Sequence, residues 1–166
     1  MKVLGIVASA VVVLAAAAVG AGQLGLLAGT APVLGVTNGR LKPPSSNPNS
    51  VSSQAGFYPE HPQQAYAAIA PLKYTGDGDA AMARLADLLR QSSGTKIVTQ
   101  QPGYIYAQCS TPVLKFTDDV EFWLDKTNSV IQFRSASRLG RKDFGVNRAR
   151  MEAIRARFQT QVLTGS

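Results

Sequence analysis

The sequence predicts a single α+β domain, in which two helices pack on a mostly antiparallel sheet in the order β-α-β-β-β-β-α. Two segments, residues 80–91 and 147–162, carry apolar residues at helical spacing. Between them, four short segments of strand composition are joined in pairs by turn residues. Because short turns connect antiparallel neighbours, these segments predict two hairpins in a two-layer domain.

The chain of 166 residues opens with an uncharged apolar segment. No charged side chain lies between Lys2 and Arg40, and the segment is long enough to cross a bilayer. A basic start, an apolar stretch and the small residues before Gly22 also match a cleavable signal peptide. We expect residues 1–31 to be a signal peptide or an N-terminal membrane anchor. A buried helix of a cytosolic domain is disfavoured, because this segment is apolar on all faces.

Residues 32–63 are rich in Pro, Ser and Asn, and we name them the strap. This composition is typical of an extended linker or of a loop that packs over a domain. The domain itself is expected over residues 64–166. It starts with a strand at residues 67–74, which Pro71 assigns to a sheet edge. A turn with an N-cap at residues 76–79 then leads into the first helix.

The four central segments form two predicted hairpins. Residues 96–100 and 104–110 flank a Gln-Pro-Gly turn, and residues 118–125 pair with residues 130–137. One register of the second hairpin is self-consistent, because it places apolar opposite apolar and acid opposite base. Its pairs are Leu124 with Ile131, Phe122 with Phe133, Glu121 with Arg134, and Asp118 with Ser137.

The last helix follows a basic segment, residues 133–157, which holds eight of the seventeen Lys and Arg residues. Asp143 or Asn147 could cap this helix, because a short side-chain oxygen can accept an orphan backbone N–H. The apolar stripe of the helix consists of Met151, Ile154, Phe158 and Val162.

Polar residues of the second hairpin and the last helix form the candidate site. Arginine offers a planar fork for carboxylate or phosphate, and a helix N-terminus adds backbone donors, so we interpret the group as an anion-binding rim. The alternative is a network of ion pairs that holds the last helix to the sheet. The candidate residues are Asp118, Asp119, Arg134, Ser135, Ser137, Arg138, Asn147 and Arg148.

Three motifs resemble the bacterial family of domains of unknown function 1499. They are GRLKPPSSNPNSVSSQ at residues 39–54, DDVEF at 118–122 and RSASRLGRKDFGVNRAR at 134–150, and the resemblance spans about residues 34–157. The resemblance implies an ordered strap and an envelope location, which we expect to be the periplasm of a Gram-negative bacterium, but no reaction. The two cysteines of the family fall on Pro44 and Ser50, so this chain lacks that pair.

Several kinds of chemistry are not expected. Cys109 is the single cysteine and His61 the single histidine, so a disulfide within the chain and a Cys–His metal cluster are excluded. Residues 20–25 fit a G-x-G-x-x-G pattern, but they lie in the apolar leader, without the helix and acidic residue that a dinucleotide site needs. We therefore expect no cofactor and no metal.

The net charge of +7 points to an anionic partner. Nucleic acid is not expected, because aromatic residues do not interleave with the basic ones and export removes the usual target. We predict a non-catalytic envelope domain that binds an anionic ligand, a lipid or a protein surface. The alternatives are an envelope hydrolase that uses Asp118, Asp119 and Arg138, and a purely structural assembly domain.

Overall fold

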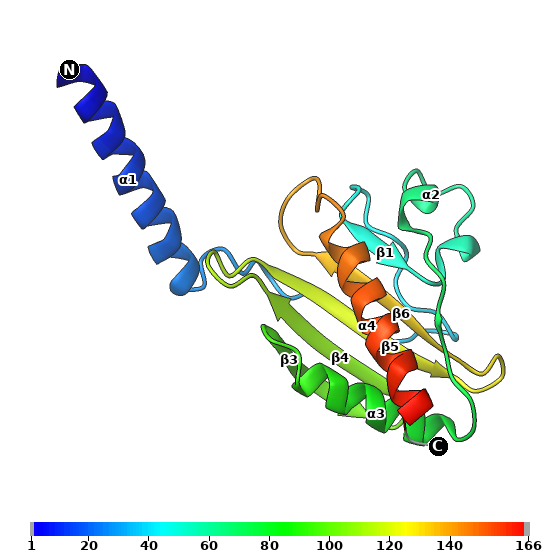
Figure 1. Ribbon diagram of the computed structural model, residues 1–166. Helices are drawn as coiled ribbons and strands as arrows, with labels where there is room; N and C mark the ends of the chain where they lie inside the picture. The colour runs from blue at the N-terminus through cyan, green and yellow to red at the C-terminus, as the bar shows by residue number, and fades with distance from the viewer. Residues whose placement is uncertain (1, 165–166) are drawn as a thin grey trace.

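Six strands form one antiparallel sheet in the computed structural model, which describes residues 2–164 (Figure 1). The order across the sheet is β1-β6-β5-β4-β3, and β2 pairs with the start of β6. The predicted α+β class is confirmed. The strands are β1 (Ser50–Ser52), β2 (Leu72–Lys73), β3 (Thr95–Gln101), β4 (Tyr104–Ser110), β5 (Thr117–Asp125) and β6 (Val130–Ser137).

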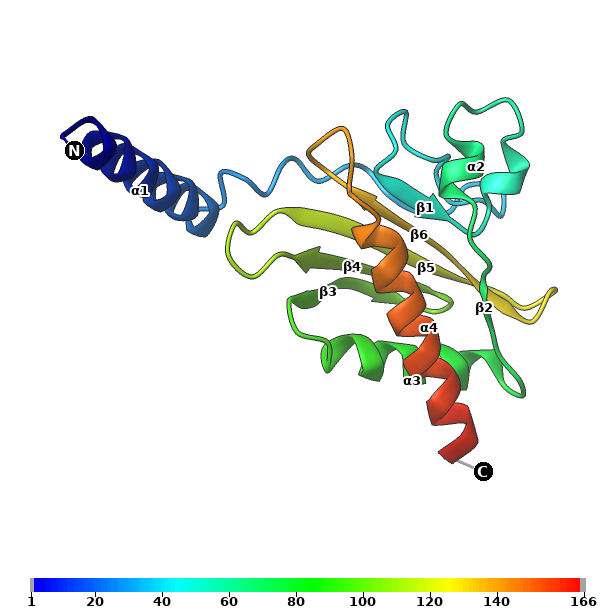
Figure 2. The same cartoon turned by 45° about the horizontal axis from the view of Figure 1, so that its top comes forward.

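Two helices, α3 (Gly78–Arg90) and α4 (Val146–Thr164), cover one face of this sheet (Figure 2). Asp77 caps α3, because its carboxylate accepts a hydrogen bond of 2.7 Å from the amide of Ala80. The core lies between the helices and the sheet. Its largest fully buried side chains include Leu85, Leu89, Ile105, Phe122, Phe133, Met151 and Phe158.

The register of the second hairpin is as predicted. Phe122 lies opposite Phe133, and Glu121 lies opposite Arg134. The two phenylalanine rings are tilted by 51° with centroids 6.3 Å apart, which is a favourable aromatic geometry. The pairs Leu124–Ile131 and Asp118–Ser137 also match the prediction.

The expected strand at residues 67–74 is much shorter than predicted. Only Leu72 and Lys73 pair with β6, and residues Gln64–Ala67 form the short helix α2. The carbonyls that a longer strand would have paired accept hydrogen bonds from arginines of α4 instead. Arg148 donates to residues 66 and 68, and Arg155 donates to residues 70 and 71.

The strap contributes to both the sheet and the core. Its strand β1 pairs with β6, a 3-10 helix η1 (Ala55–Phe57) follows, and Leu41 and Val51 are buried. The hydroxyl of Ser50 accepts a hydrogen bond of 2.8 Å from the amide of Ser45. This bond closes the loop between Pro44 and Ser50, the two positions where the family resemblance places cysteines.

The last helix begins after Asp143 rather than at Asn147. The carboxylate of Asp143 accepts hydrogen bonds from the amides of Gly145 and Asn147, both at 3.1 Å. Asn147 is therefore inside the first turn, and Asp143 supplies the cap. Met151, Ile154 and Phe158 are buried as predicted, whereas the side chain of Val162 lies outside the described residues.

At one edge of the sheet, β3 contains a β-bulge. Ile97 pairs with Ala107 and Thr99 with Tyr106, so Val98 is an extra residue in the strand. Helix α3 packs beside this strand (Figure 1).

The apolar N-terminal segment forms α1 (Lys2–Gln23), which projects from the domain (Figure 1). Residues Gly5–Gln23 have a mean hydropathy of 2.2, so by length and composition this helix could cross a membrane. Side chains in its middle, such as Val12 and Leu14, are exposed. Helix α1 is therefore not a buried helix of the domain core.

Candidate functional site

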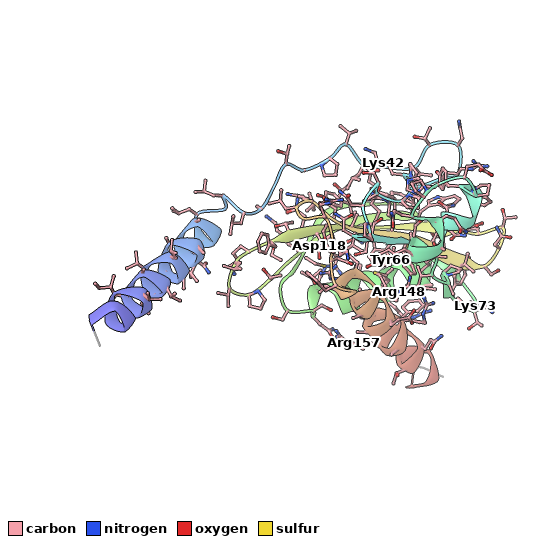
Figure 3. All side chains as sticks on the ribbon, turned by 90° about the horizontal axis from the view of Figure 1, so that it is seen from above. Lys42, Tyr66, Lys73, Asp118, Arg148 and Arg157 are labelled. Carbon is pink, nitrogen blue, oxygen red and sulfur yellow. The ribbon has the colours of Figure 1, made fainter. Side chains whose placement is uncertain are left out.

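The sheet divides the candidate residues between its two faces. Successive side chains of β5 alternate, so Asp118 lies on the face covered by the helices and Asp119 lies on the opposite face. The strap contacts that opposite face, through Gly35 and Pro43, and we name it the open face because α3 and α4 do not cover it. Figure 3 shows these two sides: Lys42 of the strap lies on one side of the sheet, and Arg148 and Arg157 of α4 lie on the other.

The helix-covered face holds a buried polar cluster. The guanidinium of Arg150 lies 2.5 Å from the carboxylate of Asp118 and donates to Ser135 at 3.2 Å and to Asn147 at 2.9 Å. The hydroxyl of Ser135 donates to Asn147 at 2.5 Å, and Asn147 donates to the hydroxyl of Ser137 at 2.9 Å. We name these five residues the helix-face cluster, and they connect α4 to β5 and β6.

Asn147 extends the helix-face cluster to the strap. Its amide nitrogen donates to the backbone carbonyl of Asn49 at 3.1 Å and to the carboxylate of Asp143 at 2.9 Å. Burial alone would raise the pKa of Asp143, but hydrogen bonds from Tyr66, Asn147 and Gly145 outweigh it and lower the pKa below its ordinary value. Asp143 therefore stays ionised and holds the start of α4.

The site predicted from the sequence omits Arg150 and includes Arg148. Arg148 instead donates to the carbonyls of Tyr66 at 2.6 Å and Ala68 at 3.1 Å, so it holds the chain before β2 (Figure 3). The sequence did contain a signal for Arg150, which lies on the flank of the apolar stripe of α4 opposite to the flank that carries Arg148. That flank faces Asp118 once the helix docks on the sheet.

On the open face, Asp119 and Arg138 form a bidentate ion pair. The two nitrogen–oxygen distances are 2.8 and 2.7 Å, and the side chains are 2% and 7% exposed. The hydroxyl of Tyr106 donates to the same carboxylate at 2.6 Å. Burial, together with this bond to Asp119, raises the pKa of Tyr106, so its hydroxyl remains a donor.

Glu121 is the second carboxylate of the open face. One oxygen accepts hydrogen bonds of 2.8 Å from the hydroxyl of Tyr104 and from the amide of Gly35 in the strap. The other oxygen is buried and has no hydrogen-bond partner among the described residues. Burial raises the pKa of Glu121 even though Tyr104 and Gly35 favour its ionised form.

Arg134 lies opposite Glu121 in the register but uses its hydrogen bonds on the strap. Its guanidinium donates to the carbonyl of Pro43 at 3.0 Å and to the hydroxyl of Ser45 at 3.2 Å. Burial lowers the pKa of Arg134, and the nearby carboxylates of Glu121 and Asp119 act in the opposite direction. Glu121 and Arg134 thus lie opposite each other in the register, as predicted. The hydrogen bonds of Arg134, however, go to Pro43 and Ser45 of the strap.

A pocket of about 250 Å³ lies between the strap and the open face. Three cationic side chains and one carboxylate line it, so positive charge is in excess. We name it the strap pocket. Its lining residues are Thr30, Pro32, Leu34, Lys42 and Ser45 from the chain before β1, and Asp119, Arg134, Ala136, Ser137 and Arg138 from the sheet and the residue after it.

This geometry disfavours joint action of Asp118 and Asp119 on one substrate. The sheet lies between the two carboxylates, and each one is paired with its own arginine. Within residues 2–164, no three His, Cys, Asp or Glu side chains gather as a metal site would require. Cys109 is a buried thiol whose pKa is raised by burial, which makes the thiolate scarce.

The fold and the polar sheet face define a two-layer α+β domain with an ordered strap, preceded by an apolar helix. No curated protein and no solved structure matches the chain. The family model described as "Protein of unknown function (DUF1499)" matches residues 40–158. The chain belongs to this family, and the match includes most of the strap.

Proposed function

We propose that the chain is an envelope protein, retained in the membrane by α1, whose domain binds an anionic group in the strap pocket without converting it. The excess of positive charge in that pocket supports this proposal. Lys42, Arg134 and Arg138 face the single carboxylate of Asp119 there. A volume of about 250 Å³ has room for one phosphate or carboxylate group and the few atoms attached to it.

The arginines of the strap pocket are held in place before any ligand arrives. The bidentate pair with Asp119 fixes Arg138, and the strap fixes Arg134. A preorganised guanidinium loses little side-chain freedom when it binds an anion. Lys42 is exposed, so its ammonium can turn toward a ligand.

The length of α1 and the contacts at its end support its retention in the mature protein. The helix continues through residues 19–21, where a signal peptide would be cut, up to Gln23. There the side chain of Gln23 donates to the carbonyl of Val113 at 3.0 Å. A Cβ on Gly22 would lie only 2.5 Å from the carbonyl oxygen of Leu114, so the helix end packs closely on the domain.

The test compares K42A with K73A in the full chain, because both lysines are exposed and lie on different sides of the domain (Figure 3). Native mass spectrometry of the protein from its own envelope first shows whether an anion is retained. Titration with inorganic phosphate and with a short-chain phosphatidylglycerol then separates a free anion from a lipid headgroup. We expect K42A to weaken binding about fivefold, which is about 1 kcal/mol for one placed cation, and K73A to leave it unchanged.

A structural role is the second candidate, and the helix-face cluster favours it. Arg150 there is satisfied within the protein, as a network that only holds the fold would require. If no anion is retained and K42A binds both probes as K73A does, the anion-binding proposal is wrong and the structural role stands.

A further inference from the structure

Two loops at the end of the sheet next to α1 expose apolar side chains. Val113 and Phe116 lie in the β4–β5 loop, and Leu139 and Phe144 lie in the β6–α4 loop. Phe144 is 93% exposed and has a φ of 51°, a region that bulky residues rarely occupy. A large aromatic ring held in solvent at this cost makes a partner outside the domain the simplest explanation.

Both loops contact the chain that leaves α1. The β4–β5 loop touches the helix end itself, through the bond from Gln23 to Val113. The β6–α4 loop begins at Arg138 and Leu139, against which Gly29 packs so closely that a Cβ there would lie 2.9 Å from the Cβ of Arg138. Figures 1 and 2 show both loops at the side of the sheet that faces α1.

The short connection fixes how far these loops can lie from the bilayer. Helix α1 has 22 residues, which is about 33 Å of helix and close to the thickness of the hydrocarbon core. Its end at Gln23 would then lie at the headgroups. Gly29 follows six positions after Gln23, a reach of at most about 21 Å, so the β6–α4 loop also stays near the membrane surface.

The charge of the two loops fits an anionic surface. Lys115, Arg141 and Lys142 lie beside the exposed apolar residues, and residues 111–116 include no acidic side chain. The carboxylate of Asp143 is buried and accepts hydrogen bonds from Tyr66 and from the start of α4. Apolar tips flanked by cations match the boundary between anionic headgroups and acyl chains.

We propose that residues 111–116 and 138–146 form a docking edge, which rests on the anionic lipid surface of the bilayer that holds α1. The inference rests on the proposed retention of α1. The docking edge orients the domain, and it keeps the strap pocket, whose wall includes Thr30 and Arg138, close to the headgroups.

The test places a tryptophan at the docking edge of the full chain. F144W and F57W are each reconstituted in bilayers of phosphatidylcholine and phosphatidylglycerol with brominated acyl chains, which quench nearby tryptophan. Phe57 is a matched control, because it is exposed and belongs to η1, which packs against α2 away from α1 (Figure 1). For each variant we take the quenching in excess of that of the wild type. We expect this excess to be at least twofold larger for F144W than for F57W.

A charge variant tests the lipid preference. In the F144W background, K115A/R141A/K142A should lower the quenching in anionic bilayers to the level seen in pure phosphatidylcholine. The control K73A/K96A/R157A removes the same charge from exposed positions elsewhere and should leave the quenching unchanged.

Alkaline extraction of the same samples separates the two proposals. If alkali releases the protein, α1 is not embedded, and both the retention of α1 and the docking edge are wrong. If the protein stays embedded and F144W is quenched no more than F57W, the docking edge alone is wrong. Equal quenching in neutral and anionic bilayers would likewise overturn the choice of an anionic surface.

Discussion

Arg150 and Arg157 lie on the same flank of α4, but their surroundings differ. Arg150 is paired with the buried Asp118, whereas Arg157 is exposed and donates to the hydroxyl of Ser92. Removing Arg150 leaves a buried carboxylate without its cation. We expect R150A to lower the free energy of unfolding by about 3 kcal/mol and R157A by less than about 0.5 kcal/mol, measured by urea denaturation. Equal losses would show that the helix-face cluster does not hold α4.

We expect Glu121 to make the stability of the protein depend on pH, and glutamine at this position to remove that dependence. Its folded-state pKa is raised above the ordinary 4.5 by burial, so ionisation costs the folded state more than the unfolded one. The neutral carboxyl of Glu121 therefore makes its full contribution to the free energy of unfolding below the ordinary pKa. This contribution is lost as the pH rises through the pKa of the folded state. Glutamine keeps an oxygen for the bonds from Tyr104 and Gly35.

The expected result is that E121Q is more stable than the wild type at pH 7, with a difference that disappears near pH 4. Urea denaturation across this pH range measures it. The matched control is E60Q, because Glu60 is exposed in the strap. A difference between wild type and E121Q that does not change with pH would contradict the burial argument.

At the scale of elements, the strap behaves as part of the core. Leu41 is 1% exposed, whereas Val33, also before β1, is 85% exposed. We expect L41A to lower the free energy of unfolding by about 2–4 kcal/mol, because it leaves a cavity, and V33A to have almost no effect. Thermal and urea unfolding measure both variants. Two equally small effects would mean that the strap is only a linker.

The strands differ in how well their bounds and pairing could be predicted from the sequence. The β5–β6 hairpin could be predicted to the residue, because Phe122 must face Phe133 on the core side and a one-residue slip would reverse every side chain. Strand β1 could not, because Ser50–Ser52 is too short to show a pattern and pairs with a distant strand. The overestimated strand before Lys73 has a similar cause, since arginines of α4 take its carbonyls.

The candidate site was only partly predictable for the same reason. Period-two alternation already separates Asp118 from Asp119, and the structure places each against a different arginine. Which arginine each would meet depends on how α4 and the strap dock. These contacts join residues 19 to 91 positions apart, and no local pattern encodes them.

At the scale of the whole molecule, retention of α1 is directly measurable. We expect the intact mass of the chain from its own membrane to include the segment before Gly22, because α1 continues through the cleavage motif and packs on the domain. We also expect the protein to resist extraction with alkaline carbonate. A mass that begins at Gly22 would show that the segment is a cleaved signal peptide.

Retention by α1, as proposed, would confine the protein to a membrane plane, where the bulge in β3 has a consequence. Such confinement brings neighbouring copies close together, and an unpaired sheet edge can then template aggregation between chains. The extra residue Val98 interrupts the regular spacing of amide and carbonyl groups along that edge, and Lys96 adds a charge. The bulge and Lys96 therefore disfavour the pairing of β3 with the same strand of a neighbouring copy.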